Sequence, residues 1–65
     1  MTRKDYQKVA DAIWEGFEPF YNAGNTDATA LVLKIVENLA KSFQLDNPRF
    51  DRTRFVNRCF GIKGN

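Results

Sequence analysis

The first third of the chain places its apolar side chains at the spacing of one helix face. At 100° per residue they fall within an arc of about 140°, and they are Tyr6, Val9, Ala10, Ile13, Trp14, Phe17, Phe20 and Tyr21. Thr2, with Asp5 three positions later, matches a variant capping box and predicts a helix from about Arg3. Pro19 lacks the N–H of an i−4 bond. The helix therefore either ends near Phe17 or continues, kinked, to Tyr21.

A second amphipathic stretch follows the loop at residues 22–25. Either Asn25 or Thr26 can cap it, and Asp27 suits the positive end of a helix. We expect this helix to end near Phe43 or Gln44. Its predicted main apolar face comprises Ala28, Leu31, Val32, Ile35, Val36, Leu39 and Phe43.

The last third of the chain has the clearest local signals. Asp51 is a good N-cap for a helix beginning at Arg52, and Phe50 can pack on Phe55 as a hydrophobic staple. Gly61 is placed to end that helix in a left-handed turn. So short a helix is unstable alone and must pack on the other two. No segment alternates with period two. We therefore predict an all-α fold, a compact three-helix mini-domain over residues 1–65 as a single domain, with two longer helices and one short C-terminal helix.

The second helix carries another apolar pattern beside its main face. Residues spaced four, three, four and three apart match a coiled-coil seam, and they are Thr29, Leu33, Val36, Ala40 and Phe43. This stripe either packs against both other helices or forms the seam of a homodimer. A chain of 65 residues buries only about 60% of its unfolded surface, so dimerisation would add burial. Leu33, Val36 and Ala40 are therefore candidate dimer or partner contacts.

Nine of the 65 residues are aromatic, which is a large volume for three short helices to cover. These rings either fill the core or remain partly exposed, and exposed aromatic side chains are favoured at protein interfaces. Trp14, Phe20 and Tyr21 are the further candidates for contact with a protein partner.

Charge is unevenly distributed along the chain. The formal net charge is +2, yet residues 46–65 carry five basic and only two acidic side chains. Four arginines lie on the predicted short helix or in the loop before it, namely Arg49, Arg52, Arg54 and Arg58. Their side chains could bind phosphates. Alternatively, arginines of the third helix neutralise acidic side chains of the first. The acidic side chains in question are Asp11, Glu15 and Glu18.

Several classes of chemistry are disfavoured. The chain has no histidine and one cysteine, Cys59, whose position beside Phe55 and Val56 in the helical phase indicates a packed core thiol. The acidic side chains of the first helix form a solvated face rather than a metal or acid–base site. We predict no catalytic residue, no metal, no cofactor and no enzyme activity.

No apolar run approaches a membrane span, and no secretory signal is evident, so we expect a cytoplasmic protein.

Both ends of the chain resemble a group of very short proteins encoded by bacteriophages and related mobile elements. The resemblance rests on residues 1–6 (Met-Thr-Arg-Lys-Asp-Tyr), and on residues 47–55 (Asn-Pro-Arg-Phe-Asp-Arg-Thr-Arg-Phe) with Cys59 shortly after. In that group a glycine directly follows the cysteine, whereas here Phe60 intervenes. The resemblance implies a compact helical fold and a location in the host cytoplasm, and it carries no assigned activity.

Two functions are compatible with these patterns. The first is a small phage-type helical interaction protein that binds a host or phage protein, acting as a possible homodimer. The alternative is a nucleic-acid-binding protein that uses the four arginines of the C-terminal region. The absence of catalytic side chains and the surplus of aromatic residues favour the first.

Overall fold

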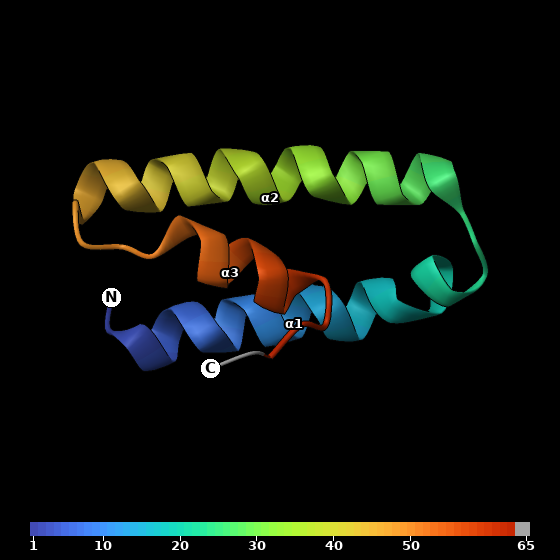
Figure 1. Cartoon of the computed structure of the whole chain (residues 1–65), viewed down its shortest axis with the longest axis horizontal. Helices are drawn as coiled ribbons and strands as arrows, with labels where there is room; N and C mark the ends of the chain where they lie inside the picture. Colours follow the sequence, from blue (N-terminus) through green and yellow to red (C-terminus); the bar gives the residue numbers. More distant parts are fainter. Residues whose placement is uncertain (64–65) are drawn as a thin grey trace.

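The chain folds into three helices, as seen in a computed structural model that describes residues 1–63 (Figure 1). They are α1 (Arg3–Asn22), α2 (Thr26–Asp46) and α3 (Arg52–Cys59), and no strand occurs in residues 1–63. The two long helices run side by side in opposite directions, and α3 lies between them along part of their length. The predicted all-α fold, with two long helices and a short C-terminal one, is confirmed.

Helix α1 begins at the predicted capping box. The backbone N–H of Asp5 donates to Thr2 Oγ1 at 3.3 Å, and the backbone N–H of Thr2 donates to Asp5 Oδ2 at 2.9 Å. The Thr2 hydroxyl also donates to Asp5 Oδ2, at 3.1 Å, and the bonds that the Thr2 backbone N–H and hydroxyl donate lower the pKa of the Asp5 carboxyl. At the other end, α1 continues through Pro19 to Asn22, so the longer of the two predicted helices is correct.

The connection between α1 and α2 is three residues long. Gly24 has a φ of 73°, and its N–H donates to the carbonyl of Tyr21 at 3.0 Å. The N–H of Asn25 donates to the carbonyl of Phe20 at 3.0 Å, and Asn25 Oδ1 accepts from the N–H of Ala28 at 3.0 Å. Asn25 therefore closes α1 and caps α2, which resolves the choice between Asn25 and Thr26.

Helix α2 ends two to three residues later than predicted, at Asp46. The next residue, Asn47, is extended, with φ −140° and ψ 98°. A residue before proline is forced away from helical geometry, so Pro48 ends the helix at the last position that its ring permits. Asn47 Oδ1 then accepts from the N–H of Arg49 at 3.1 Å, which turns the chain toward α3.

Helix α3 has the predicted signals at both ends. Asp51 Oδ1 accepts from the N–H of Arg54 at 3.0 Å, and the rings of Phe50 and Phe55 lie 5.4 Å apart. After Cys59, Gly61 has a φ of 82° and donates its N–H to the carbonyl of Arg58 at 3.1 Å. This left-handed residue reverses the chain and sends it back along α1.

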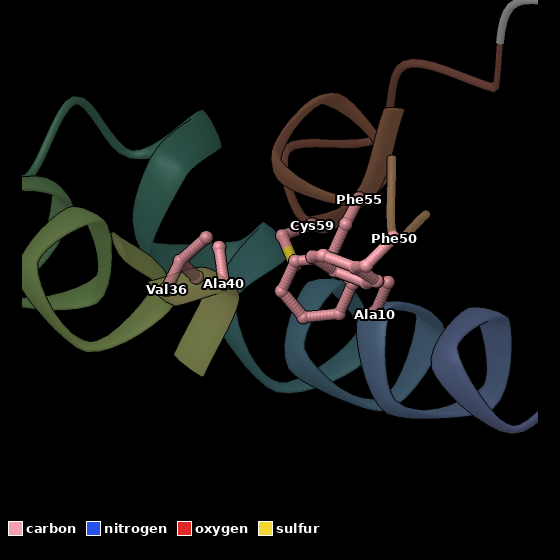
Figure 2. Close-up of a cluster of buried hydrophobic side chains, with 6 residues drawn as sticks. All are labelled: Ala10, Val36, Ala40, Phe50, Phe55 and Cys59. Carbon is pink, nitrogen blue, oxygen red and sulfur yellow. The ribbon is translucent and has the colours of Figure 1, made fainter. Parts of the chain in front are cut away.

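The core combines small residues on the long helices with larger side chains around α3. Figure 2 shows six buried side chains from all three helices and the loop before α3, namely Ala10, Val36, Ala40, Phe50, Phe55 and Cys59. Alanines on α1 and α2 leave space for the aromatic rings. Tyr6 and Phe43 pack on this cluster. The centre of the Tyr6 ring lies 4.6 Å from that of Phe50, and the centre of the Phe43 ring lies 5.5 Å from it.

The predicted apolar face of α2 is correct for Val36, which is buried, and for Val32, Leu39 and Phe43, which pack on the core, and it is wrong for Leu31 and Ile35. Leu31 and Ile35 are 63% and 49% exposed, whereas Val36 and Ala40 are fully buried. Helix α3 has only 8 residues and lies against one part of α2, which has 21 (Figure 1). A third helix this short cannot cover the whole apolar stripe of a long one, and α2 directs its smaller side chains inward.

Candidate functional site: a basic groove

A groove of about 440 Å³ lies where the start of α1, the loop before α3, α3 itself and the segment after it meet. Its lining contains five basic side chains from these separate stretches, namely Arg3, Arg49, Arg54, Arg58 and Lys63. Asp51 is the only acidic side chain among the lining residues that the structure describes. A concave surface with this charge attracts anions, because its walls focus the electrostatic field.

Aromatic and amide side chains form the rest of the groove. Phe50 and Phe55 are almost fully buried, and the ring of Tyr6 lies 4.6 Å from that of Phe50 in an edge-to-face arrangement. Gln7 and Asn47 add amide groups to the lining. Because the rings belong to the core, the shape of the groove is fixed by the same packing that stabilises the fold.

Arg58 is held in place at one side of the groove by Asp11 of α1. Its Nε and Nη2 donate to the two carboxylate oxygens of Asp11 at 2.7 and 3.0 Å. This bidentate hydrogen bonding to Arg58 lowers the pKa of the Asp11 carboxyl, and the same contact raises the pKa of Arg58. The expected neutralisation of an α1 acid by an α3 arginine is confirmed for Asp11.

The remaining basic side chains are held loosely or not at all. Arg54 Nε lies 3.8 Å from Asp51 Oδ2, and both side chains are about half exposed. Asp51 is already engaged as the N-cap of α3. Arg3, Arg49 and Lys63 make no ion pair within residues 1–63. Their charges are therefore available to a ligand.

The groove belongs to a strongly basic end of the molecule. Residues 1–11 and 46–63 contain eight of the ten basic side chains and four of the eight acidic ones. Residues 12–45 contain the other four acidic side chains and only Lys34 and Lys41. The net charge of +2 therefore conceals a basic end and an acidic end.

Sequence reasoning identified part of this site. The structure brings Arg49, Arg54 and Arg58 to the groove, whereas Arg52 is exposed and lies outside its lining. The contributions of Arg3 and Lys63 were missed. A signal for Arg3 was present, because a three-residue connection makes α1 and α2 antiparallel and brings the end of α2 beside the start of α1.

The residues predicted to contact a partner lie in three different environments. Val36 and Ala40 are fully buried within the single chain, which corrects their assignment as dimer or partner contacts. Leu33 is 39% exposed. Phe20 and Tyr21 are about half exposed, while Trp14 is partly buried between Phe17, Tyr21 and Gly61. The relevant ring distances are 6.0 Å for Trp14–Phe17 and 5.7 Å for Trp14–Tyr21.

Cys59 is fully buried and belongs to the core, as predicted. Burial raises the pKa of its thiol to about 11, and the negative charge of Asp11 contributes in the same direction. Within residues 1–63 no group of three histidine, cysteine or acidic side chains could hold a metal ion. The groove is therefore the feature of the described chain that best fits a ligand.

The two predicted classes of partner differ in what they need from the structure. None of the three helices has the length and apolar character needed to cross a membrane, over the residues that the structure describes. A protein partner would need exposed apolar or charged surface, and nucleic acid would need clustered basic side chains.

Comparison with family models, curated proteins and solved structures finds no match for this chain.

Proposed function

We propose that this chain is a small nucleic-acid-binding protein that holds a single strand in the basic groove. The observation that carries this proposal is the convergence of five basic side chains around one concave surface that contains a single carboxylate. Guanidinium groups suit phosphate oxygens, because their N–H groups donate in a planar, bidentate arrangement. Arg3, Arg49 and Arg54 supply that chemistry from α1, from the loop and from α3.

The shape of the site favours a single strand over a duplex. A helix that reads a duplex projects into the major groove, whereas α3 is packed between α1 and α2 (Figure 1). A single strand can enter a concave surface, and its bases can stack on aromatic rings or hydrogen-bond to side-chain amides. Tyr6, Gln7 and Asn47 offer these groups beside the basic side chains.

An acidic protein segment is the competing ligand, because its carboxylates would also be attracted by the arginines. It would make little use of Tyr6, whose partly exposed ring belongs to the groove lining. The Arg54–Asp51 contact is loose, at 3.8 Å between two exposed side chains, so Arg54 can turn toward either ligand. The proposal therefore commits to nucleic acid, and an acidic peptide serves as the competitor.

Fluorescence anisotropy with labelled single-stranded and duplex oligonucleotides tests the proposal. Arg49→Glu should weaken single-strand binding roughly tenfold, because it removes one phosphate contact and adds repulsion. Lys34→Glu on α2 is the matched control, since it changes the net charge equally and lies outside the groove. Binding to the control variant should stay within about twofold of the wild type.

The dependence on salt gives a second readout. Each phosphate contact contributes a slope of about −0.7 in log affinity against log salt for a single strand. Arg49→Glu should therefore make the slope shallower, and Lys34→Glu should not. Equal losses in both variants would indicate attraction by net charge alone and would contradict the proposal. Preferential binding of an acidic peptide, displaced by neither oligonucleotide, would also overturn it.

A further inference from the structure

A seam of uncharged residues, three of them apolar, runs along the exposed side of α2. Leu31, Ile35, Asn38, Ser42 and Leu45 are spaced four, three, four and three residues apart. All five are exposed, with Leu31 at 63%, Ile35 at 49% and Leu45 at 78%. This seam differs from the one predicted through Val36 and Ala40, which packs inside the chain.

The spacing of the seam is that of the contact positions in a coiled coil. Residues in this pattern return to one side of a helix and meet the same positions of a second helix. No charged side chain interrupts the seam between Leu31 and Leu45. Asn38 and Ser42 are the polar positions of the seam, and burying them in a dimer costs stability unless each side chain finds a hydrogen-bond partner.

We infer that a second copy of this chain docks on the α2 seam, with the two α2 helices parallel. In that arrangement each seam residue meets its counterpart, and Lys41 of one copy lies beside Asp46 of the other. That pair of positions is where coiled coils place their flanking ion pairs. Neither Lys41 nor Asp46 makes an ion pair within residues 1–63 of a single chain.

The antiparallel alternative has the opposite electrostatics. Aligning two copies about Asn38 in that direction brings Lys34 of one copy beside Lys41 of the other. The flanking charges then repel twice, whereas the parallel alignment gives two attractive pairs. Charge complementarity therefore selects the parallel dimer.

The parallel dimer places both basic grooves at the same end, because Asn47, directly after α2, lines each groove together with the start of α1. This consequence rests on the proposed function: two grooves at one end of a dimer would bind a longer strand that spans both more tightly than one groove would. The dimer itself depends only on the α2 surface. Its failure and the failure of nucleic-acid binding are therefore separable.

Sedimentation equilibrium from micromolar to millimolar protein measures the association. The seam is shorter than a standard interface, so we expect a dissociation constant on the order of 100 μM. Leu31→Glu should abolish the dimer. Leu33→Glu is the matched control, being the same change two residues away on a different side of α2, and it should leave dimerisation intact. Both positions are exposed, and circular dichroism should show unchanged helicity.

Two further variants test the alignment. Lys41→Glu should weaken the dimer about tenfold, and adding Asp46→Lys should restore it by reversing both charges. Ser42→Cys should form an intermolecular disulfide under mild oxidation, because only the parallel alignment brings the two positions within bridging distance. A wild-type chain that is monomeric at millimolar concentration would overturn the inference. So would a dimer that Leu33→Glu disrupts and Leu31→Glu does not, or a Ser42→Cys variant that dimerises but forms no intermolecular disulfide under mild oxidation.

Discussion

Gly61 lies directly against the indole ring of Trp14. A Cβ atom at Gly61 would come within 2.7 Å of Trp14 Cε2 and Cζ2, and the φ of Gly61 is 82°. Two separate requirements, a left-handed backbone and space for an indole, therefore fall on one residue. The contact joins the turn after α3 to the middle of α1, where Trp14 also packs on Phe17 at 6.0 Å.

We predict that Gly61→Ala destabilises the fold more than an ordinary glycine substitution. A left-handed alanine costs about 1–2 kcal/mol, and displacing a packed ring adds about 1–3 kcal/mol. Urea unfolding followed by Trp14 fluorescence measures the loss. The emission of the folded variant should also shift, because the indole must move away from Cβ.

Gly24→Ala is the matched control for this prediction. Gly24 has a similar φ of 73°, but nothing lies within 4 Å of an added Cβ. It should lose only the backbone contribution of about 1–2 kcal/mol, with unchanged Trp14 emission. Equal destabilisation of the two variants would show that the Trp14–Gly61 contact contributes nothing to stability.

Local signals in the sequence were enough to predict where the helices begin and how α3 ends. Thr2, Asn25, Asp51 and Gly61 act through hydrogen bonds within five residues of themselves, so their roles do not depend on the rest of the fold. The face that α2 buries is different in kind. It depends on how far α3 reaches along α2, and no pattern within α2 carries that information.

Val36 and Ile35 are adjacent β-branched residues that should respond differently to truncation. Val36→Ala leaves a cavity in a fully buried site and should cost about 2 kcal/mol. Ile35 is half exposed, so Ile35→Ala should change stability by less than about 0.5 kcal/mol in dilute protein. Thermal or urea unfolding distinguishes these outcomes. A larger loss for Ile35→Ala would mean that Ile35, rather than Val36, faces the core.

The basic groove was predictable only as a list of arginines. Arg49, Arg54 and Arg58 are close together in the sequence, which indicates a basic cluster. Arg3 lies at the groove because α1 and α2 are antiparallel, and Lys63 lies there because the chain turns at Gly61. The sequence pattern paired arginines of α3 with three acids of α1 without identifying which arginine contacts which acid. Choosing Asp11 among them required the position of α3 along α1, which periodicity does not specify.

The Asp11–Arg58 pair should make stability depend on acidity. The pKa of the Asp11 carboxyl is lower in the folded state than its ordinary value of 3.8. The pair therefore contributes fully to the free energy of unfolding above pH 3.8, and this contribution is lost as the pH falls through the lower pKa of the folded state. Asp11→Asn should therefore be less stable than wild type at neutral pH, with the difference shrinking in acid. Both side chains are partly open to water, so added salt should reduce the difference.

Glu15→Gln controls for the loss of one negative charge on the same helix, because Glu15 is exposed and makes no ion pair within residues 1–63. Its stability should follow that of the wild type between neutral and acidic pH. If Asp11→Asn and Glu15→Gln gave the same pH profile, the bidentate contact with Arg58 would have no measurable effect on folding.

Cys59 should react with thiol reagents only when the chain opens. Its side chain is fully buried, and burial raises the pKa of the thiol to about 11, so little reactive thiolate forms at neutral pH. We expect labelling by a disulfide reagent to be at least about a hundredfold slower in buffer than in denaturing urea. Gly61→Ala should accelerate labelling in buffer more than Gly24→Ala, because it destabilises the fold further. Rapid labelling of the native wild type would instead mean that α3 detaches from α1 and α2 without global unfolding, and the shape of the groove would then not be fixed by the core.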